Sequence, residues 1–470
     1  MRQLPPAHPA APSPSPPRRG SVSRTALVVC FSQTQRRRGL CELSLADVGE
    51  GSVGAFGCGL RSEFQYAAMG EVFTESYAGR PVRKVSCSSV TYVATSSPHG
   101  SGVFGTLLLY LSSVRSTLVD VFLPQGYPYS VSEDYLQYQI WDTLQAFASS
   151  MTGALATEAV LKGAGVGDQS ASALAASLTW LAKDGLGMVG RIAFSFFKGS
   201  ELDSDCKKWR LVADILNDLA FFIDLLSPAF PGSFFVCACT SSILRCVVGV
   251  AGGATRTAIT QHQARRNNLA DVASKDGSQE TMVNVTALLA SLVLLPLVSG
   301  KQSIIWSLFV IFTFVHLYAN YRAVRSLNME TLNLKRATIL IRSWLSSGQI
   351  MSVVECNRSE PLFSSFGSRY LGCSLRDMFG YQRRAPSSKL HATDEYTLLI
   401  DTKRNIGWVA LADGGTRHSS LRAIFDLEAL AMNESRSGEE FNTFLDKLTA
   451  RGWRTDGNNL GFDEWTYSTK

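Results

Sequence analysis

The most constraining feature of this 470-residue chain is a stretch near its middle that almost lacks charge. Between residues 281 and 321 the only Asp, Glu, Lys or Arg is Lys301. The two halves, 281–300 and 302–321, each have about the 20 residues that a helix needs to cross a hydrocarbon core of roughly 30 Å. The sequence therefore predicts two membrane-spanning helices that form a hairpin with a tight turn near Gly300.

Weaker apolar segments precede this hairpin. Residues 143–161 are interrupted by Glu158 alone and residues 171–197 by three charges, and residues 205–227 carry apolar side chains at helical spacing. Pro228 and Pro231 end that helix, and another is expected from 234 to 250. Residues 103–114 are too few to cross a bilayer and predict a buried or interfacial helix. The expected fold class is mainly α, a polytopic helical membrane bundle.

Beyond residue 330 the charge density becomes that of a water-soluble protein. Periodicity predicts helices at 330–346, 419–432 and 439–451, and short strands at 396–400 and 407–411. A small C-terminal α+β soluble domain, residues 331–470, is therefore expected to follow the membrane domain at 101–330.

Residues 1–100 are expected to form a disordered or loosely ordered N-terminal leader, because they are rich in Gly, Ser and Pro and lack periodicity. The first 40 residues contain several Arg and no acid, which fits an organelle transit peptide. Seven prolines among the first 17 residues nevertheless oppose the amphipathic helix that such a signal needs.

The positive charges indicate an orientation. Arg322, Arg325 and Lys335 follow the second hairpin helix, whereas Lys301 stands alone at the turn. By the positive-inside rule the C-terminal domain is predicted on the cytoplasmic side, in an organelle that the sequence does not identify, with the basic loop 256–280 on the same side. The net charge of +6 is spread in short clusters rather than a continuous stripe. Membrane lipid is therefore an expected partner, and nucleic acid is not.

The densest polar cluster lies between the apolar segments, at 256–280. Guanidinium forks beside amides suit an anionic headgroup, a phosphate or a protein partner, whereas the simpler interpretation is a solvated loop with positive-inside charge. Both interpretations stay open. The candidate residues are Arg256, His262, Arg265, Arg266, Asn267, Asn268, Asp271, Lys275 and Asp276.

Two acids on the helix 205–227, Asp218 and Asp224, are candidate intramembrane polar residues. An acid in a membrane is costly, so each could line a cavity, or could instead cap a helix or pair with Arg191 or Arg245. His316, on the last apolar helix, is interpreted as a packed or interfacial residue rather than a polar membrane site.

Motifs for catalysis are absent from the sequence. Gly185, Gly187 and Gly190 match GxGxxG but follow a helical segment rather than a strand, so we interpret them, like Gly249 and Gly253, as sites of close helix packing. The sequence contains no HExxH, CxxC or GxSxG pattern. We therefore predict no catalytic residues, no cofactor and no metal site.

Four long motifs carry a resemblance to a known family. They are FLPQGYPYSVSEDYLQYQIWDTLQAF at 122–147, FKGSELDSDCKKWRLVADILND at 197–218, VGVAGGATRTAITQHQARRNNLADVASKDGSQET at 248–281 and HLYANYRAVRSLNMETLN at 316–333. On these motifs the chain, from about residue 120 to its end, resembles the root UVB-sensitive family. It departs from the family at Tyr129, where relatives usually have Asp, and at Phe196 and Phe197, where many have a Trp pair.

The resemblance implies a membrane location and, in plants, roles in early seedling development, UV-B responses and auxin distribution, with plastid targeting for some members. It implies no catalytic activity and no transported substrate. The leading hypothesis is a multi-pass membrane protein that handles or transports a small polar or anionic compound. The alternative is a membrane-anchored scaffold or signalling adaptor that binds a protein partner through its C-terminal domain.

Overall fold

The computed structural model describes residues 73–77, 80–86, 89–92, 117–163, 173–363, 366–433 and 438–468. The chain divides into two compact units, Met1–Glu71 and Val72–Lys470, and every described residue belongs to the second. Most of the predicted leader and the predicted helix at 103–114 lie outside the described residues.

One part of the predicted leader forms regular structure. Strands β1 (Phe73–Tyr77), β2 (Arg80–Ser86) and β3 (Ser89–Tyr92) pair in an antiparallel three-stranded sheet. Two-residue connections and Val and Thr residues favour this local pairing. The leader prediction rested on average composition, which hid this short β-rich segment.

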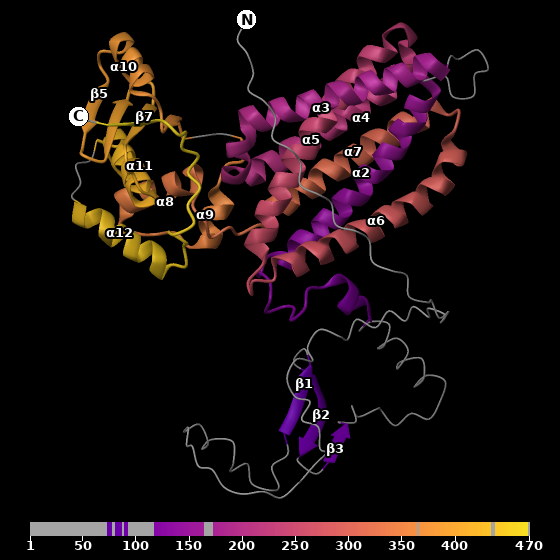
Figure 1. Ribbon diagram of the computed structural model, residues 1–470, viewed down its shortest axis with the longest axis horizontal. Helices are drawn as coiled ribbons and strands as arrows, with labels where there is room; N and C mark the ends of the chain where they lie inside the picture. The colour runs from indigo at the N-terminus through magenta and orange to yellow at the C-terminus, as the bar shows by residue number, and fades with distance from the viewer. Residues whose placement is uncertain are drawn as a thin grey trace, which may run out of the picture. The chain divides into compact units, whose positions relative to one another are not determined.

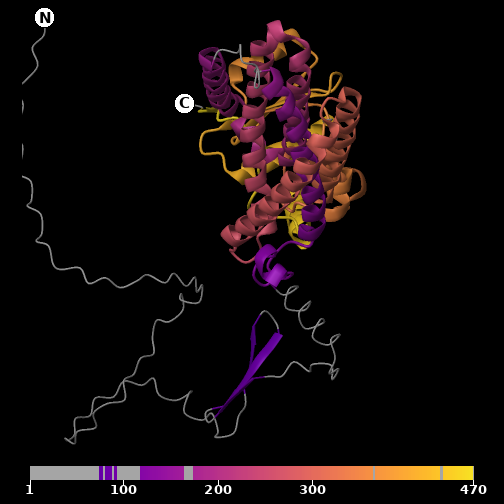
Figure 2. The same ribbon diagram turned by 90° about the vertical axis from the view of Figure 1, so that its right-hand side faces the viewer.

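Six long helices follow among the described residues, and they lie side by side in a bundle (Figures 1 and 2). The mainly α fold class is confirmed. The helices are α2 (Tyr135–Gly163), α3 (Ala173–Ser204), α4 (Cys206–Leu226), α5 (Phe234–Gln263), α6 (Leu269–Val298) and α7 (Gln302–Ser326).

The helix boundaries follow the sequence only in part. Pro228 and Pro231 separate α4 from α5, as expected, through two short 3-10 turns. Helix α6, however, begins at Leu269, twelve residues before the predicted start at 281, because charged residues in its first turns find partners on other helices. Among the described residues, three segments are long and apolar enough to cross a membrane: Pro231–Gln263, Leu269–Val298 and Gln302–Ser326.

The predicted hairpin turn is confirmed, and the two helices that it joins pack mainly against α2. Gly300 does make the tight turn between α6 and α7, with φ of +78°. Helix α2, however, packs along both of them, so that α6 and α7 contact each other far less than each contacts α2 (Figure 1). Small residues on α2, among them Ala156 and Ala159, let it fit between them.

Helices α3 and α5 approach closely at the glycine-rich segment. A Cβ added to Gly187 would lie 2.7 Å from Sγ of Cys246 on α5, closer than a side chain can stand. The interpretation of this glycine as a packing residue is therefore confirmed.

The C-terminal domain is a small α+β fold, as predicted. Its elements are α8 (Leu334–Ser347), α9 (Val353–Ser359), β4 (Ser368–Leu371), α10 (Leu375–Arg384), β5 (Lys389–Ala392), β6 (Tyr396–Asp401), β7 (Ile406–Ala412), α11 (Arg417–Ala431), α12 (Gly438–Ala450) and β8 (Thr466–Tyr467). The sheet order is β4-β7-β6-β5, with β8 also paired to β7. Elements α9, α10, β4, β5 and β8 were not predicted, because each is short.

Both faces of this sheet are covered. Leu398 and Ile400 pack with α8 and α11, whereas the intervening Leu399 packs with Met378 of α10 on the other face. This alternation is the two-residue period of a strand. The main core adds the aromatic side chains of Phe425, Phe441 and Phe444, so this domain holds a conventional apolar interior.

Candidate functional site

The predicted ligand segment 256–280 is not one loop. Helix α5 continues to Gln263 and α6 begins at Leu269, so the segment consists of two helix ends and a connection of five residues. The expectation of a long loop is therefore corrected, and Arg266 does not share a helix with Arg256. The nine predicted residues fall into three groups with different surroundings.

The first group holds the α5–α6 connection against the segment before α2. Asn267 has a φ of +52° and turns the chain, and Asn268 donates its amide to the Ser130 carbonyl at 3.1 Å. Asp271 accepts from the backbone of Gln125, while Lys275 donates to the Asp120 carbonyl. The exposed Arg266 belongs to the same connection. These contacts stabilise the fold locally and enclose no cavity.

The second group, His262 and Arg265, lies where the bundle meets the C-terminal domain. Arg265 forms a two-pronged ion pair with Glu330, at 2.7 and 2.8 Å. His262 lies 2.9 Å from the carboxylate of Asp134, which also accepts from the backbone N–H of Asn328 at 2.6 Å. Burial would raise the pKa of Asp134, but the His262 contact and the other hydrogen bonds lower it to about 2.

The third group, Arg256 and Asp276, faces the interior of the bundle. Arg256 lies 2.5 Å from Asp276 and 2.5 Å from Glu280, both on α6. Asp276 also accepts from the side-chain amide of Gln139 on α2 at 3.2 Å. Three helices are thus linked by one chain of charged and polar contacts.

A cavity of about 310 Å³ opens beside Arg256, between α2, α4, α5 and α6. Its charged lining is balanced, with Asp142 and Glu280 opposite Arg210 and Arg256. The neutral polar lining consists of Gln145, Ser149, Ser150 and Asn284. We call this space the bundle cavity.

One wall of the bundle cavity is made of glycine. Gly252 and Gly253 of α5 line it, and a Cβ added to either would meet no atom within 4 Å. The prediction that Gly253 serves close helix packing is therefore wrong, because this glycine borders open space. A helix wall without side chains leaves the peptide backbone accessible to a ligand.

A buried polar network continues from the bundle cavity toward the middle of the bundle. His316 is fully buried, with Nδ1 2.8 Å from Asp218 and Nε2 2.9 Å from Gln145. Gln145 donates to Asp214 at 2.8 Å. His316 lies ten residues before the end of α7 at Ser326, which corresponds to about 15 Å along a helix axis.

The two acids predicted inside the membrane domain therefore have different surroundings. Asp218 belongs to the buried network, and Asp224 forms an ion pair with Arg245 on α5. The pairing of Asp224 was one of the two alternatives that the sequence left open. His316 is a member of the polar network rather than an interfacial side chain.

Sequence reasoning missed several residues of the bundle cavity. Arg210 lies 2.8 Å from Asp142 and closes the network on the α4 side, and Gln145 joins the cavity to His316. An isolated charge in an apolar helix is a signal for such sites, and Asp142 carries it. The neutral Gln145 and Ser149 carry no such signal.

Comparison with known proteins identifies the domain. The family description "Vitamin B6 photo-protection and homoeostasis domain" matches residues 110–348. The chain is 42% identical over 279 residues to "RUS family member 1" of Dictyostelium discoideum, covering 58% of this chain and 53% of that protein. It thus spans about half the length of the Dictyostelium relative.

Plant proteins are similar over comparable lengths. The chain is 40% identical over 295 residues to "Protein root UVB sensitive 3" of Arabidopsis thaliana, covering 59% of this chain and 67% of that protein. It is 27% identical over 361 residues to the Arabidopsis "Protein root UVB sensitive 2, chloroplastic", covering 72% of this chain and 82% of that protein. No solved structure matches the chain. The matched domain and the two closely similar relatives show that this chain belongs to the root UVB-sensitive family.

Proposed function

We propose that this chain is a multi-pass membrane protein that binds a small polar compound in the bundle cavity and carries it across the membrane. The single observation that carries the proposal is a charged cavity inside a bundle whose outer surface is apolar. The three apolar segments that contain α5, α6 and α7 are proposed to span the bilayer.

The outward-facing side chains support a lipid environment. On α6 the exposed residues from 288 to 297 are apolar, including Leu288, Leu289, Leu292 and Val293, and Leu292 is 63% exposed. Exposed apolar surface over several neighbouring helices is costly in water and favourable in a bilayer. The charged ends of α5, α6 and α7 then lie together at the side of the C-terminal domain.

The cavity lining suggests the ligand class. Two arginines and two acids balance one another, so the lining favours a compound that carries both charged and hydrogen-bonding groups. Arg210 and Arg256 can each offer a guanidinium fork to an acidic group of such a compound. The glycine wall permits contact with a flat ligand face.

The opposite half of the bundle is closed by apolar side chains. Leu155, Leu225, Val298, Ile305 and Phe309 form a buried cluster there. In a carrier, a cavity open on one side and an apolar barrier on the other correspond to one of two alternating states. The buried network around His316 lies between the cavity and this barrier.

The family description suggests the first compounds to test. It names vitamin B6, whose phosphorylated forms carry acidic, basic and ring groups together. We therefore propose radiolabelled pyridoxal phosphate and unphosphorylated pyridoxine as the probes, in vesicles that contain the purified full chain.

The test uses the glycine wall. Gly252→Ala and Gly252→Leu would narrow the cavity without meeting neighbouring atoms, and both residues favour a helix over Gly by up to about 1 kcal/mol. Gly185→Ala and Gly185→Leu are matched controls, because Gly185 also faces open space but lies on α3 outside the cavity.

We expect uptake of a probe to fall with the Ala variant, to fall further with the Leu variant and to stay unchanged in both controls. Equal uptake by Gly252→Leu and the unaltered protein would show that the cavity is not the binding site. Absence of uptake and of binding for both probes would contradict the vitamin B6 assignment and favour the scaffold alternative.

A further inference from the structure

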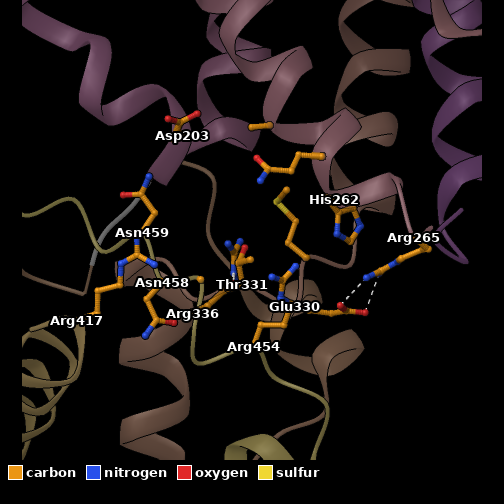
Figure 3. Close-up of a pocket in the computed structure, with 14 residues that line it drawn as sticks. Asp203, His262, Arg265, Glu330, Thr331, Arg336, Arg417, Arg454, Asn458 and Asn459 are labelled. Carbon is orange, nitrogen blue, oxygen red and sulfur yellow. Dashed lines mark hydrogen bonds and ion pairs between the residues drawn. The ribbon is translucent and has the colours of Figure 1, made fainter. Parts of the chain in front are cut away.

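A second cavity, of about 550 Å³, lies at the junction of the bundle and the C-terminal domain (Figure 3). His262 and Arg265 come from the end of α5, Glu330 and Thr331 from the linker after α7, and Arg417 and Arg454 from the C-terminal domain. We call this space the junction cavity. It shares no lining residue with the bundle cavity.

The floor of the junction cavity is held by backbone contacts. Arg454 donates its N–H to the Glu330 carbonyl at 2.9 Å, and Asn459 donates to the Leu332 carbonyl at 3.0 Å. The linker after α7 and the segment 454–459 therefore run together along the cavity. Both domains contribute side chains to a fixed frame.

Positive charge exceeds negative charge in the lining. The four arginines are Arg265, Arg336, Arg417 and Arg454, whereas the lining acids are Asp203 and Glu330. Glu330 neutralises Arg265, and Glu360 behind the cavity neutralises Arg336 at 2.8 Å. Arg417 and Arg454 are therefore left with Asp203 as the one remaining lining acid, so the cavity keeps a net positive charge.

Most N–H donors of the Arg417 and Arg454 guanidinium groups make no hydrogen bond to another residue in the described part of the chain. Arg417 donates to the backbone carbonyl of Asp456 at 2.9 Å, and Arg454 lies 3.6 Å from the exposed carboxylate of the same residue. Each guanidinium has five N–H donors. In Figure 3 the side chain of Arg417 lies near Asn458 and Asn459, whereas Arg454 lies on the side of Glu330.

A buried acceptor adds a second requirement. Oδ1 of Asn458 is buried and has no hydrogen-bond partner among the described residues, although Nδ2 of the same side chain donates to the Thr455 carbonyl. A buried polar atom without a partner is costly, and a ligand hydroxyl could satisfy it. The ligand is thus expected to carry a donor as well as an anion.

We propose that the junction cavity binds a phosphate monoester, with Arg417 and Arg454 on the phosphate oxygens. Arginine forks match phosphate geometry and form charge-assisted hydrogen bonds. The phosphate comes either from a soluble compound or from a lipid headgroup, since the cavity lies beside the charged helix ends. This site goes beyond the carrier proposal and does not depend on it.

The experiment measures binding of inorganic phosphate and glycerol phosphate to the full chain in detergent by calorimetry, at constant ionic strength. Arg417→Gln and Arg454→Gln are each expected to weaken binding by roughly tenfold, the loss of one charge-assisted contact. Arg451→Gln, three residues from Arg454 but outside the lining, should bind like the unaltered protein.

A variant that is expected to bind phosphate more tightly distinguishes a change at the site from misfolding. Glu330→Gln removes a lining acid and releases the Arg265 fork from its ion pair, so it is expected to tighten phosphate binding severalfold. An unfolded or distorted protein could not give this result. Absence of saturable binding, or equal binding by the unaltered protein and the Arg417 and Arg454 variants, would overturn the proposal.

The source of the phosphate is decided in lipid discs. Discs of phosphatidylcholine are compared with discs that also contain phosphatidic acid, whose headgroup is a phosphate monoester. Loss of soluble phosphate binding by the unaltered protein in the second discs assigns the site to a headgroup. Unchanged binding in both discs assigns it to a soluble compound.

Discussion

In the C-terminal domain the main core cluster is aromatic and aliphatic, and the buried acids Glu360 and Glu428 are paired with arginines, whereas the helical bundle buries Asp214, Asp218, His316 and Asn320 together. The outward-facing side chains of the two parts show the reverse difference in polarity. Leucines and phenylalanines of α3 and α6 point outward from the bundle, and charged side chains cover the C-terminal domain. This reversal is what the proposed membrane location predicts, with lipid around the bundle and water around the C-terminal domain.

The junction between the two parts combines both kinds of interior. Lys207 at the start of α4 is buried against Glu360 at 3.0 Å, and Arg336 shares the same carboxylate. Burial would raise the pKa of Glu360, but Arg336 and Lys207 lower it to about 2. The contact between the bundle and the C-terminal domain thus contains a cluster of buried charges. In an isolated domain the same position would hold an apolar side chain or water.

The largest expected effect comes from breaking this cluster. Glu360→Gln leaves two buried cations without their counter-ion, so we expect a loss of about 3–5 kcal/mol of stability. Thermal unfolding in detergent measures it. Glu355→Gln changes an exposed neighbour whose capping role Gln can also fill, so it should leave stability nearly unchanged. Equal effects of the two variants would contradict a buried role for Glu360.

The lipid-facing surface gives the next effect. Leu292→Lys places a charge in the middle of the exposed apolar face of α6, and we expect insertion to become less favourable by about 2.5–3.5 kcal/mol. Resistance to carbonate extraction from membranes is the measurement. Ser274→Lys, on the exposed charged end of the same helix, should remain fully membrane-bound. Normal insertion of the Leu292 variant would mean that this face meets water.

Lowering the pH should weaken the junction but not the apolar core of the C-terminal domain. The pKa of Asp134 is lowered from 3.8 to about 2, so its contribution to stability is present above about pH 4 and is lost as the pH falls through about 2. The free energy of unfolding of the unaltered protein should exceed that of Asp134→Asn by roughly 2 kcal/mol at pH 7 and by nearly nothing at pH 2. Chemical unfolding at both pH values measures the difference. A constant difference would exclude titration of Asp134 as its cause.

The smallest effect concerns the polar interior of the bundle. His316→Leu fills similar space but leaves Asp218 without its donor, which should cost about 1–3 kcal/mol. His391→Leu, on an exposed strand of the C-terminal domain, should be nearly neutral. Unfolding in detergent compares them. A stabilised His316 variant would indicate that packing outweighs the network.

The fold could be predicted from sequence where one physical signal dominated. Uncharged length predicted α7 to within a few residues, and charge density located the C-terminal domain. The start of α6 was placed too late because Asp276 and Glu280 look like loop residues until Arg256 is known to meet them. Such pairings depend on helix packing that no local pattern contains.

The candidate site was predictable only in part for the same reason. The sequence located Arg256, His262 and Asp276 in one segment, yet the structure places Arg256 at the bundle cavity and His262 at the junction cavity, while Asp276 pairs with Arg256 outside the lining of either cavity. The bundle cavity needs Asp142, Gln145 and Arg210 from helices far away in sequence. Residue type signals that a polar group has a role, but the helix arrangement decides which groups share a space.

The contacts of Lys207 and Asp134 also order events during synthesis. Lys207 emerges from the ribosome about 150 residues before Glu360, its counter-ion. Asp134 is likewise synthesised before its partners, the side chain of His262 and the backbone N–H of Asn328. The end of the bundle beside the junction therefore cannot reach its final arrangement until the first part of the C-terminal domain has been translated.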